Sequence, residues 1–134
     1  MKRGIDVFSL SDQSKAFHID VGLLTYDRSV RVRSPLQRQD TEYLKQLPMH
    51  SRELVYYLLE YRSMGIRMVR VNSHNVIITK EESFSWEKID EAVINGLMML
   101  FSQYEDDEML RREDLVVSGD VSHVFSSSPY QKNS

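Results

Sequence analysis

The chain has 134 residues, no cysteine and a formal net charge of −3. This length fits one domain of ordinary size, and the hydrophobic fraction of 41% is near the globular average once glycine is counted with it. Without cysteine the chain supplies no disulfide, no thiolate metal ligand and no thiol nucleophile. It has no run of about 18 apolar residues, and its N-terminus contains Asp6 and Asp12, unlike an organelle presequence. We therefore expect a cytoplasmic protein that does not span a membrane.

Charge is distributed unevenly along the chain. Residues 1–80 hold 13 Lys and Arg against 8 Asp and Glu, whereas residues 81–134 hold 4 against 12. Opposite charge on the two halves favours their attraction, within one fold or between copies. The pattern therefore permits head-to-tail oligomers.

The N-terminal part predicts an arm followed by a hairpin. Residues 1–14 are mixed and polar, which is typical of a loose arm. Apolar and polar residues then alternate over residues 15–24 and again over residues 29–33, the period of strands with one buried face. We expect the two runs to pair as an antiparallel hairpin, with the valines of the second run inward and its arginines outward.

Helical spacing begins after this hairpin. A short polar helix is predicted over Asp40–Leu47 and ends before Pro48. Leucines at helical spacing predict a second, longer helix over Ser51–Met64, in which Ser51 is the N-cap. Gly65 stands where a left-handed residue is favoured after a helix.

A second hairpin and a last helix follow. Residues 66–71 and 76–79 are rich in β-branched side chains, and the Asn- and Ser-rich segment between them predicts a turn. Ser85 is a good N-cap for a helix that begins at Trp86 and reaches at least Phe101. Its predicted apolar stripe is Trp86, Ile89, Val93, Leu97 and Leu100, and its predicted polar face is Glu87, Asp90 and Glu91.

These elements predict an α+β domain in the order ββαββα. It consists of two antiparallel hairpins and two helices that pack on one face of the sheet. We expect the domain to cover residues 15–112, after the arm and before a flexible serine-rich tail over residues 113–134.

The sequence contains no recognised catalytic motif. It has no glycine-rich phosphate loop, no G-x-S-x-G elbow and no His-Glu-x-x-His pattern. Its four histidines lack a partner at metal-ligand spacing. We therefore expect no catalytic residue, no metal and no cofactor, and a protein that is not an enzyme.

The first candidate binding surface is basic. Arg28, Arg31 and Arg33 lie on the outward face of the first predicted hairpin, where they would recognise an acidic partner. Together with Arg38 they would alternatively neutralise the phosphates of a nucleic acid. A purely structural interpretation is that the arginines protect an exposed strand edge from aggregation.

Two further patches are candidates for partner binding. Tyr57 and Tyr61 lie off the leucine stripe of their predicted helix and present an aromatic contact face, unless they pack in the core. The acidic run near the end of the last helix is a second charged patch or a solvated helix end, and it lacks the glycine of a calcium loop. The run consists of Glu105, Asp106, Asp107 and Glu108.

Several of these strings resemble the N-terminal domain of the Nfu/NifU-type iron–sulfur scaffold family. The likeness is carried by Asn75–Glu81, followed by Trp86 and an apolar-striped helix, and by a Ser-led helix that ends at a glycine before a β-branched strand. It covers residues 48–101, and residues 15–34 by pattern only. The resemblance implies a ββαββα domain associated with iron–sulfur cluster assembly, and it transfers no catalytic residue.

The chain departs from the family in three respects. The usual Pro-Asn-Pro-Asn opening is missing, and two features have no counterpart in the comparison, namely the Cys-x-x-Cys pair of the cluster-binding domain and the tail of this chain after Phe101. The resemblance therefore implies an accessory interaction domain, standing alone, that docks to a scaffold, chaperone or client protein. The first alternative from the residues is a nucleic-acid-binding module that uses the arginine-rich hairpin, and a hydrolase or transferase is a second one.

Overall fold

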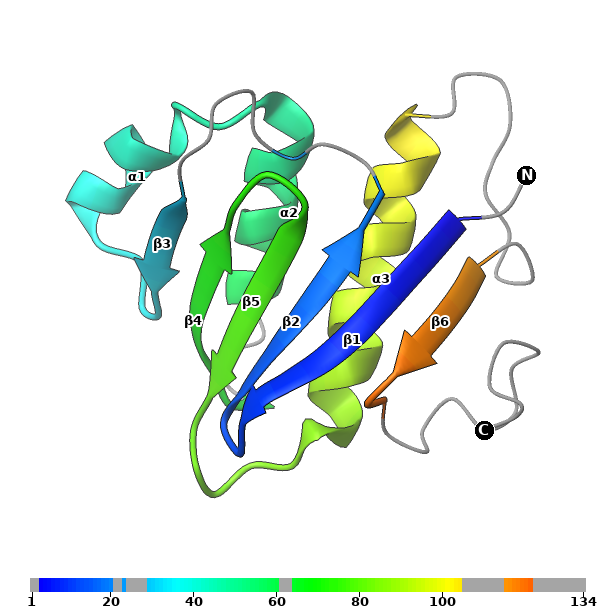
Figure 1. The fold of residues 1–134 in the computed structure, drawn as a ribbon. Coiled ribbons are helices and arrows are strands. Elements are labelled where there is room, and N and C mark those ends of the chain that lie inside the picture. The colour runs from blue at the N-terminus through cyan, green and yellow to red at the C-terminus, as the bar shows by residue number, and fades with distance from the viewer. Residues whose placement is uncertain (1–2, 21–22, 24–28, 61–63, 105–114, 122–134) are drawn as a thin grey trace.

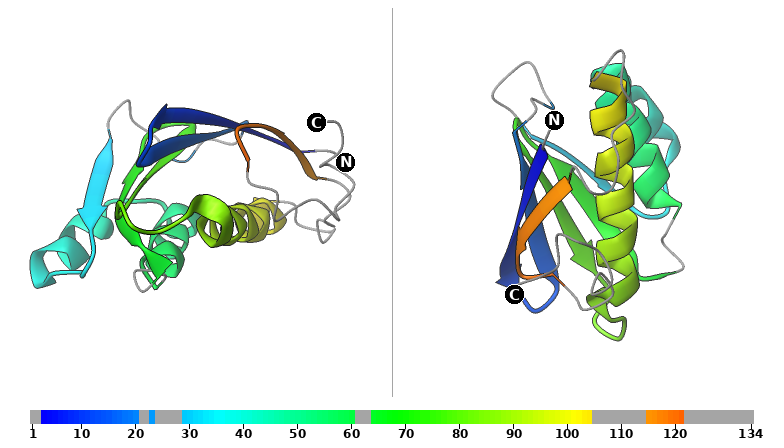
Figure 2. Two further views of the ribbon diagram at one scale, coloured as in Figure 1. Left: turned by 90° about the horizontal axis from the view of Figure 1, so that it is seen from below. Right: turned by 90° about the vertical axis from the view of Figure 1, so that its right-hand side faces the viewer.

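The computed structural model describes residues 3–20, 23, 29–60, 64–104 and 115–121. The predicted α+β class is confirmed: α2 and α3 pack on one face of a six-stranded sheet, and no described helix or strand covers the opposite face, which we call the open face (Figures 1 and 2). There are more strands than predicted, and the predicted short helix is present as α1, beside the two helices that pack on the sheet. In chain order the elements are β1 (Arg3–Ser11), β2 (Ser14–Ile19), β3 (Val30–Arg33), α1 (Arg38–Leu44), α2 (Met49–Leu59), β4 (Ile66–Val71), β5 (Asn75–Lys80), α3 (Trp86–Tyr104) and β6 (Leu115–Gly119).

The strand order is β3-β4-β5-β2-β1-β6. The predicted hairpin of β4 and β5 is confirmed by its antiparallel register. The predicted pairing of β2 with β3 is wrong, because β2 pairs with β1 and β5 whereas β3 pairs with β4. Alternation of apolar and polar residues specifies which face of a strand is buried, but it carries no information about the partner strand.

Strands form near both ends of the described chain, so the predicted loose arm is wrong and the predicted flexible tail is wrong for residues 115–119, whereas residues 122–134 lie outside the described residues. Residues 3–11 form β1, whose Ile5 and Val7 are buried. Residues 115–119 form β6, which runs parallel to β1 and places Val117 opposite Ile5. These short runs become strands because the sheet pairs them and buries one of their faces, not because their composition is strongly β-forming.

The start of α2 also differs from the prediction. The N-cap position is Pro48, and Ser51 lies in the first turn of the helix. The Ser51 side chain is fully buried, and its hydroxyl donates a 2.7 Å hydrogen bond to the Leu23 carbonyl. Ser51 is therefore a tertiary anchor for the chain that precedes β3, and not a cap.

Gly65 has the left-handed conformation that was predicted for it. Its φ is +104°, and a Cβ at this position would lie 2.5 Å from Cγ of Phe84. Glycine is required here both by the backbone and by the close approach of that ring.

The core lies between the sheet and the pair of helices α2 and α3. The predicted stripe of α3 is confirmed, since Ile89, Val93, Leu97 and Leu100 are all buried and the half-buried Trp86 packs against the core. Val30 and Val32 of β3 face the core as predicted, and the arginines of this strand are exposed. Figure 2 shows the described helices α2 and α3 against the inner face of the sheet, whereas no described helix lies on its outer face.

Candidate functional site

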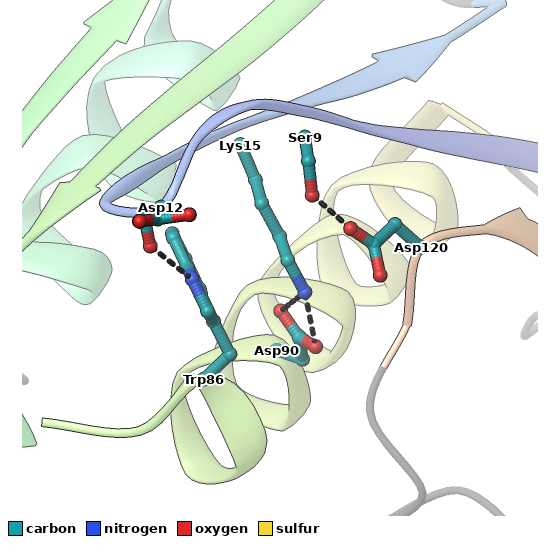
Figure 3. A network of polar contacts seen from close by, with 6 residues as sticks. All are labelled: Ser9, Asp12, Lys15, Trp86, Asp90 and Asp120. Atoms are coloured by element: carbon teal, nitrogen blue, oxygen red, sulfur yellow. Dashed lines mark hydrogen bonds and ion pairs between the residues drawn. The ribbon is translucent and has the colours of Figure 1, made fainter.

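A buried ion pair connects the sheet to α3. The predicted exposure of Asp90 is wrong: its side chain is 0% exposed and accepts hydrogen bonds of 2.9 and 3.1 Å from the Lys15 ammonium (Figure 3). The inward face of α3 is broad enough to include Asp90 beside Ile89 and Val93. Lys15 points inward from β2, so the carboxylate is buried against its own partner.

Trp86 joins this ion pair to the turn between β1 and β2. Its indole N–H donates to the Asp12 carbonyl at 3.1 Å. The Lys15 ammonium lies 4.8 Å from the ring centroid and that of Lys80 lies 5.8 Å from it, distances suited to cation–π attraction. We refer to Lys15, Lys80, Trp86 and Asp90 as the lysine–tryptophan cluster.

Lys80 enters the cluster with different partners. It is 6% exposed, and its ammonium donates to the carbonyl oxygens of Glu81 and Glu82 at 3.2 and 3.4 Å. In the part of the chain that the structure describes, no carboxylate forms an ion pair with it. The cluster thus contains two buried ammonium groups and one buried carboxylate. The Trp86 ring and the backbone carbonyls stabilise the positive charge that the carboxylate does not balance.

A cleft of about 470 Å³ adjoins the cluster. The Ser9 hydroxyl donates to the Asp120 carboxylate at its rim, which ties β1 to the segment after β6. The polar side chains of the cleft make contacts that hold the fold together: Ser9 with Asp120, Trp86 with the Asp12 carbonyl, and Lys15 with Asp90. The residues that line the cleft are Ser9, Leu10, Ser11, Asp12, Lys15, Trp86, Asp120 and Val121.

Among the described residues, no group of three or more His, Cys, Asp or Glu is placed to hold a metal ion. The described helices also include none that is long and apolar enough to cross a membrane.

The predicted basic patch lies on the open face of the sheet. Arg31 and Arg33 of β3 are exposed, and the register places Arg31 directly opposite Arg70 of β4 and Arg33 opposite Met68. Arg70 is also exposed and was not predicted as a site residue. Alternation along β4 could have placed it outward, but its position beside Arg31 follows only from the pairing of β3 with β4.

The remaining basic residues of the prediction do not join this patch. Arg38 is exposed on the separate helix α1, and Arg28 lies outside the described residues. We define the arginine patch as Arg31, Arg33 and Arg70.

One row of cross-strand partners connects the arginine patch to an apolar surface. Consecutive partners across β1, β2, β5, β4 and β3 are Phe8, Ala16, Ile77, Arg70 and Arg31. Phe8 is 54% exposed and Ile77 is half-buried. This row, which we call the open-face row, therefore changes from apolar to basic as it crosses the sheet.

Tyr57 lies on the opposite side of the molecule, between α2 and α3. It is half-buried, and a Cβ at Gly96 would lie 2.9 Å from its ring. Gly96 thus allows the ring to pack closely on α3, and part of Tyr57 is used inside the fold. Tyr61 and the acidic run 105–108 lie outside the described residues, and their role in partner binding stays a prediction.

The fold is similar to that of a NifU-like protein. The solution structure of a NifU-like protein from Saccharomyces cerevisiae matches 81% of this chain and 84% of that one, with a TM-score of 0.56 and 12% identity. At this identity the likeness concerns the fold alone. The crystal structure of protein SAV1430 from Staphylococcus aureus matches 75% of this chain and 99% of that one, with a TM-score of 0.47 and 14% identity. No family model and no curated protein matches the sequence.

Proposed function

We propose that this chain is a non-catalytic interaction domain that works in iron–sulfur cluster assembly by binding a scaffold, chaperone or client protein. The observation that carries the proposal is a NifU-like fold with an open, arginine-bearing sheet face. The 134 residues contain no cysteine, so they offer a cluster no thiolate ligand. The contribution of this chain would therefore come from its surface.

The lysine–tryptophan cluster supports a non-catalytic role. Its charged groups are buried and engaged within the fold, Lys15 with Asp90 and Lys80 with backbone carbonyls and the Trp86 ring, and they join β2 and β5 to α3. Such a network fixes how the helix packs on the sheet. We assign it to the architecture, and we assign the binding function to the open face.

Two measurements test the proposal. The purified chain is incubated anaerobically with ferrous iron and sulfide, and we expect no stoichiometric cluster in its absorption spectrum. A tagged chain is also used to capture partners from its native organism, and we expect iron–sulfur assembly proteins among those enriched over a tag-only control. A stoichiometric cluster bound by this chain alone, or a captured set without such proteins, would overturn the proposal.

The nucleic-acid alternative gains one supporting observation from the fold. Arg70 joins Arg31 and Arg33 on one surface, which raises the local density of positive charge. The separation of apolar and basic side chains along the open-face row favours a protein partner over a nucleic acid.

A further inference from the structure

We infer that the open face of the sheet docks an acidic protein segment that carries an apolar anchor at one end. Carboxylates of this segment would contact the arginine patch, and its apolar side chains would cover Phe8 and Ile77. The inference deepens the proposed function and rests on it in one respect, namely that the chain acts by binding another protein.

The placement of the arginines indicates an anionic partner. Arg31 and Arg70 are a directly opposed pair, an arrangement in which like charges destabilise a sheet. Within the described residues, none of the three patch arginines forms an ion pair with a carboxylate. Planar guanidinium groups match carboxylates in bidentate geometry. An acidic segment would therefore relieve the repulsion and supply the missing acceptors.

Protection of a sheet edge explains only part of the patch. β3 is an edge strand, and arginines on it discourage pairing with another chain. Arg70, however, belongs to β4, which is paired on both sides by β3 and β5. The positive charge thus extends to a strand with no free edge.

The other end of the open-face row is apolar. The Phe8 side chain is more than half exposed. Ala16, which lies between Phe8 and Ile77 in the row, is 8% exposed. No described helix or strand covers this face (Figure 2). The row thus presents apolar surface that a partner can bury, continuous with groups that bind carboxylates.

The dimensions of the row specify the partner further. Four strand spacings separate Phe8 from Arg31, a distance of about 19 Å. A helical segment of about 13 residues spans this distance. We therefore expect the apolar anchor and the acidic end of the partner segment to be separated by about that length.

The same dimensions favour a protein over a nucleic acid. Proteins that bind single strands combine a basic groove with aromatic platforms on which successive bases stack. Here the exposed ring of Phe8 is on β1 and the guanidinium groups are on β3 and β4, with the aliphatic Ala16 and Ile77 between them. The row offers no such series of platforms beside the arginines.

The test uses two fluorescein-labelled probes with the full chain. One is a peptide of about 13 residues with leucines at one end and glutamates at the other, and the second is an oligothymidylate with the same number of negative charges. The reversal variant is Arg31→Glu/Arg70→Glu. Its matched control is Lys45→Glu/Lys88→Glu, which changes the net charge equally at exposed positions outside the sheet, one after α1, where Lys45 pairs with the exposed Glu42, and one on α3.

We expect the wild-type chain and the control variant to bind the peptide with similar affinity. The reversal variant should bind it at least about tenfold more weakly, and Phe8→Ser should weaken binding without changing charge. Peptide titration followed by NMR should shift amide signals along the open-face row. Circular dichroism of each variant verifies that it is folded.

Four outcomes would overturn the inference: no peptide binding by the wild-type chain, equal loss in the control variant, tighter binding to the oligothymidylate, or NMR shifts confined to α2 and α3. These outcomes leave the proposed function intact, because no iron–sulfur protein is present in the assay. Conversely, failure to capture assembly proteins from the native organism would overturn the proposed function but would not alter the measured affinity for the peptide.

Discussion

The Lys15 ammonium and the Asp90 carboxylate lie 2.9 Å apart in the interior, with side chains 4% and 0% exposed. Removing two charges from water costs about as much as their attraction returns, so such a pair adds little net stability. It does, however, fix one position of α3 against β2. Trp86, one turn earlier on the helix, adds a second fixed point through its hydrogen bond to the Asp12 carbonyl.

Removal of one partner of this pair is expected to be far more damaging than removal of both. Asp90→Leu removes the carboxylate that pairs with the buried Lys15 ammonium, in a cluster that also contains the buried Lys80, and should cost about 3–5 kcal/mol. The double variant Lys15→Met/Asp90→Leu should lose much less. Urea denaturation followed by Trp86 fluorescence measures both. Equal losses in the single and the double variant would show that the ion pair is not the cause.

The sequence predicted the inward face of α3 but not the burial of Asp90. Periodicity correctly placed Ile89 and Val93, since apolar spacing reports which side of a helix meets the core. A carboxylate is exposed by default, and only a buried cation reverses that expectation. That cation is Lys15, on a strand distant in sequence, so no local pattern could have indicated the pair.

A similar limit applies to the sheet. Alternation predicted that Arg31 and Arg33 face outward, and the structure confirms it. Partner choice is a property of the whole sheet, so the opposition of Arg31 and Arg70 could not be derived from alternation alone. The strands β1 and β6 were missed for the same reason, because β1 is stabilised by pairing with β2 and β6, and β6 by pairing with β1.

The glycine at the end of β6 is expected to be essential for the parallel pairing. Gly119 has a φ of +100°, and a Cβ there would collide with the Val7 carbonyl oxygen. Gly119→Ala should therefore cost more than about 1–3 kcal/mol or detach β6 from β1. Hydrogen exchange at the Val117 amide measures the detachment. Gly4→Ala is the matched control, since nothing lies within 4 Å of its added Cβ; an equal loss of protection there would contradict the explanation.

Ser51 provides a test of tertiary anchoring against helix capping. At an N-cap, Ser and Asp are about equally favourable. At this buried site, Ser51→Asp would place a carboxylate against the Leu23 carbonyl, an acceptor facing an acceptor with no donor between them, and should destabilise strongly. Ser51→Ala should cost about 1–3 kcal/mol, because it leaves the carbonyl without its hydroxyl donor. Thermal unfolding measures both, and a neutral Ser51→Asp would restore the capping interpretation.

The opposition of Arg31 and Arg70 predicts that stability and binding change in opposite directions. Arg31→Glu replaces a repulsive cross-strand pair with an attractive one, and should raise the free energy of unfolding by about 0.2–1 kcal/mol. The same substitution places a carboxylate in the arginine patch and should weaken binding of an acidic peptide. In Arg31→Glu/Arg70→Glu the pair is again repulsive, so the gain in stability should disappear while binding remains weak. Urea denaturation and fluorescence anisotropy on the same samples measure the two effects. Two glutamates at these positions should repel each other as the two arginines do. A gain in stability that persists in the double variant would therefore show that the two side chains do not interact across the strands.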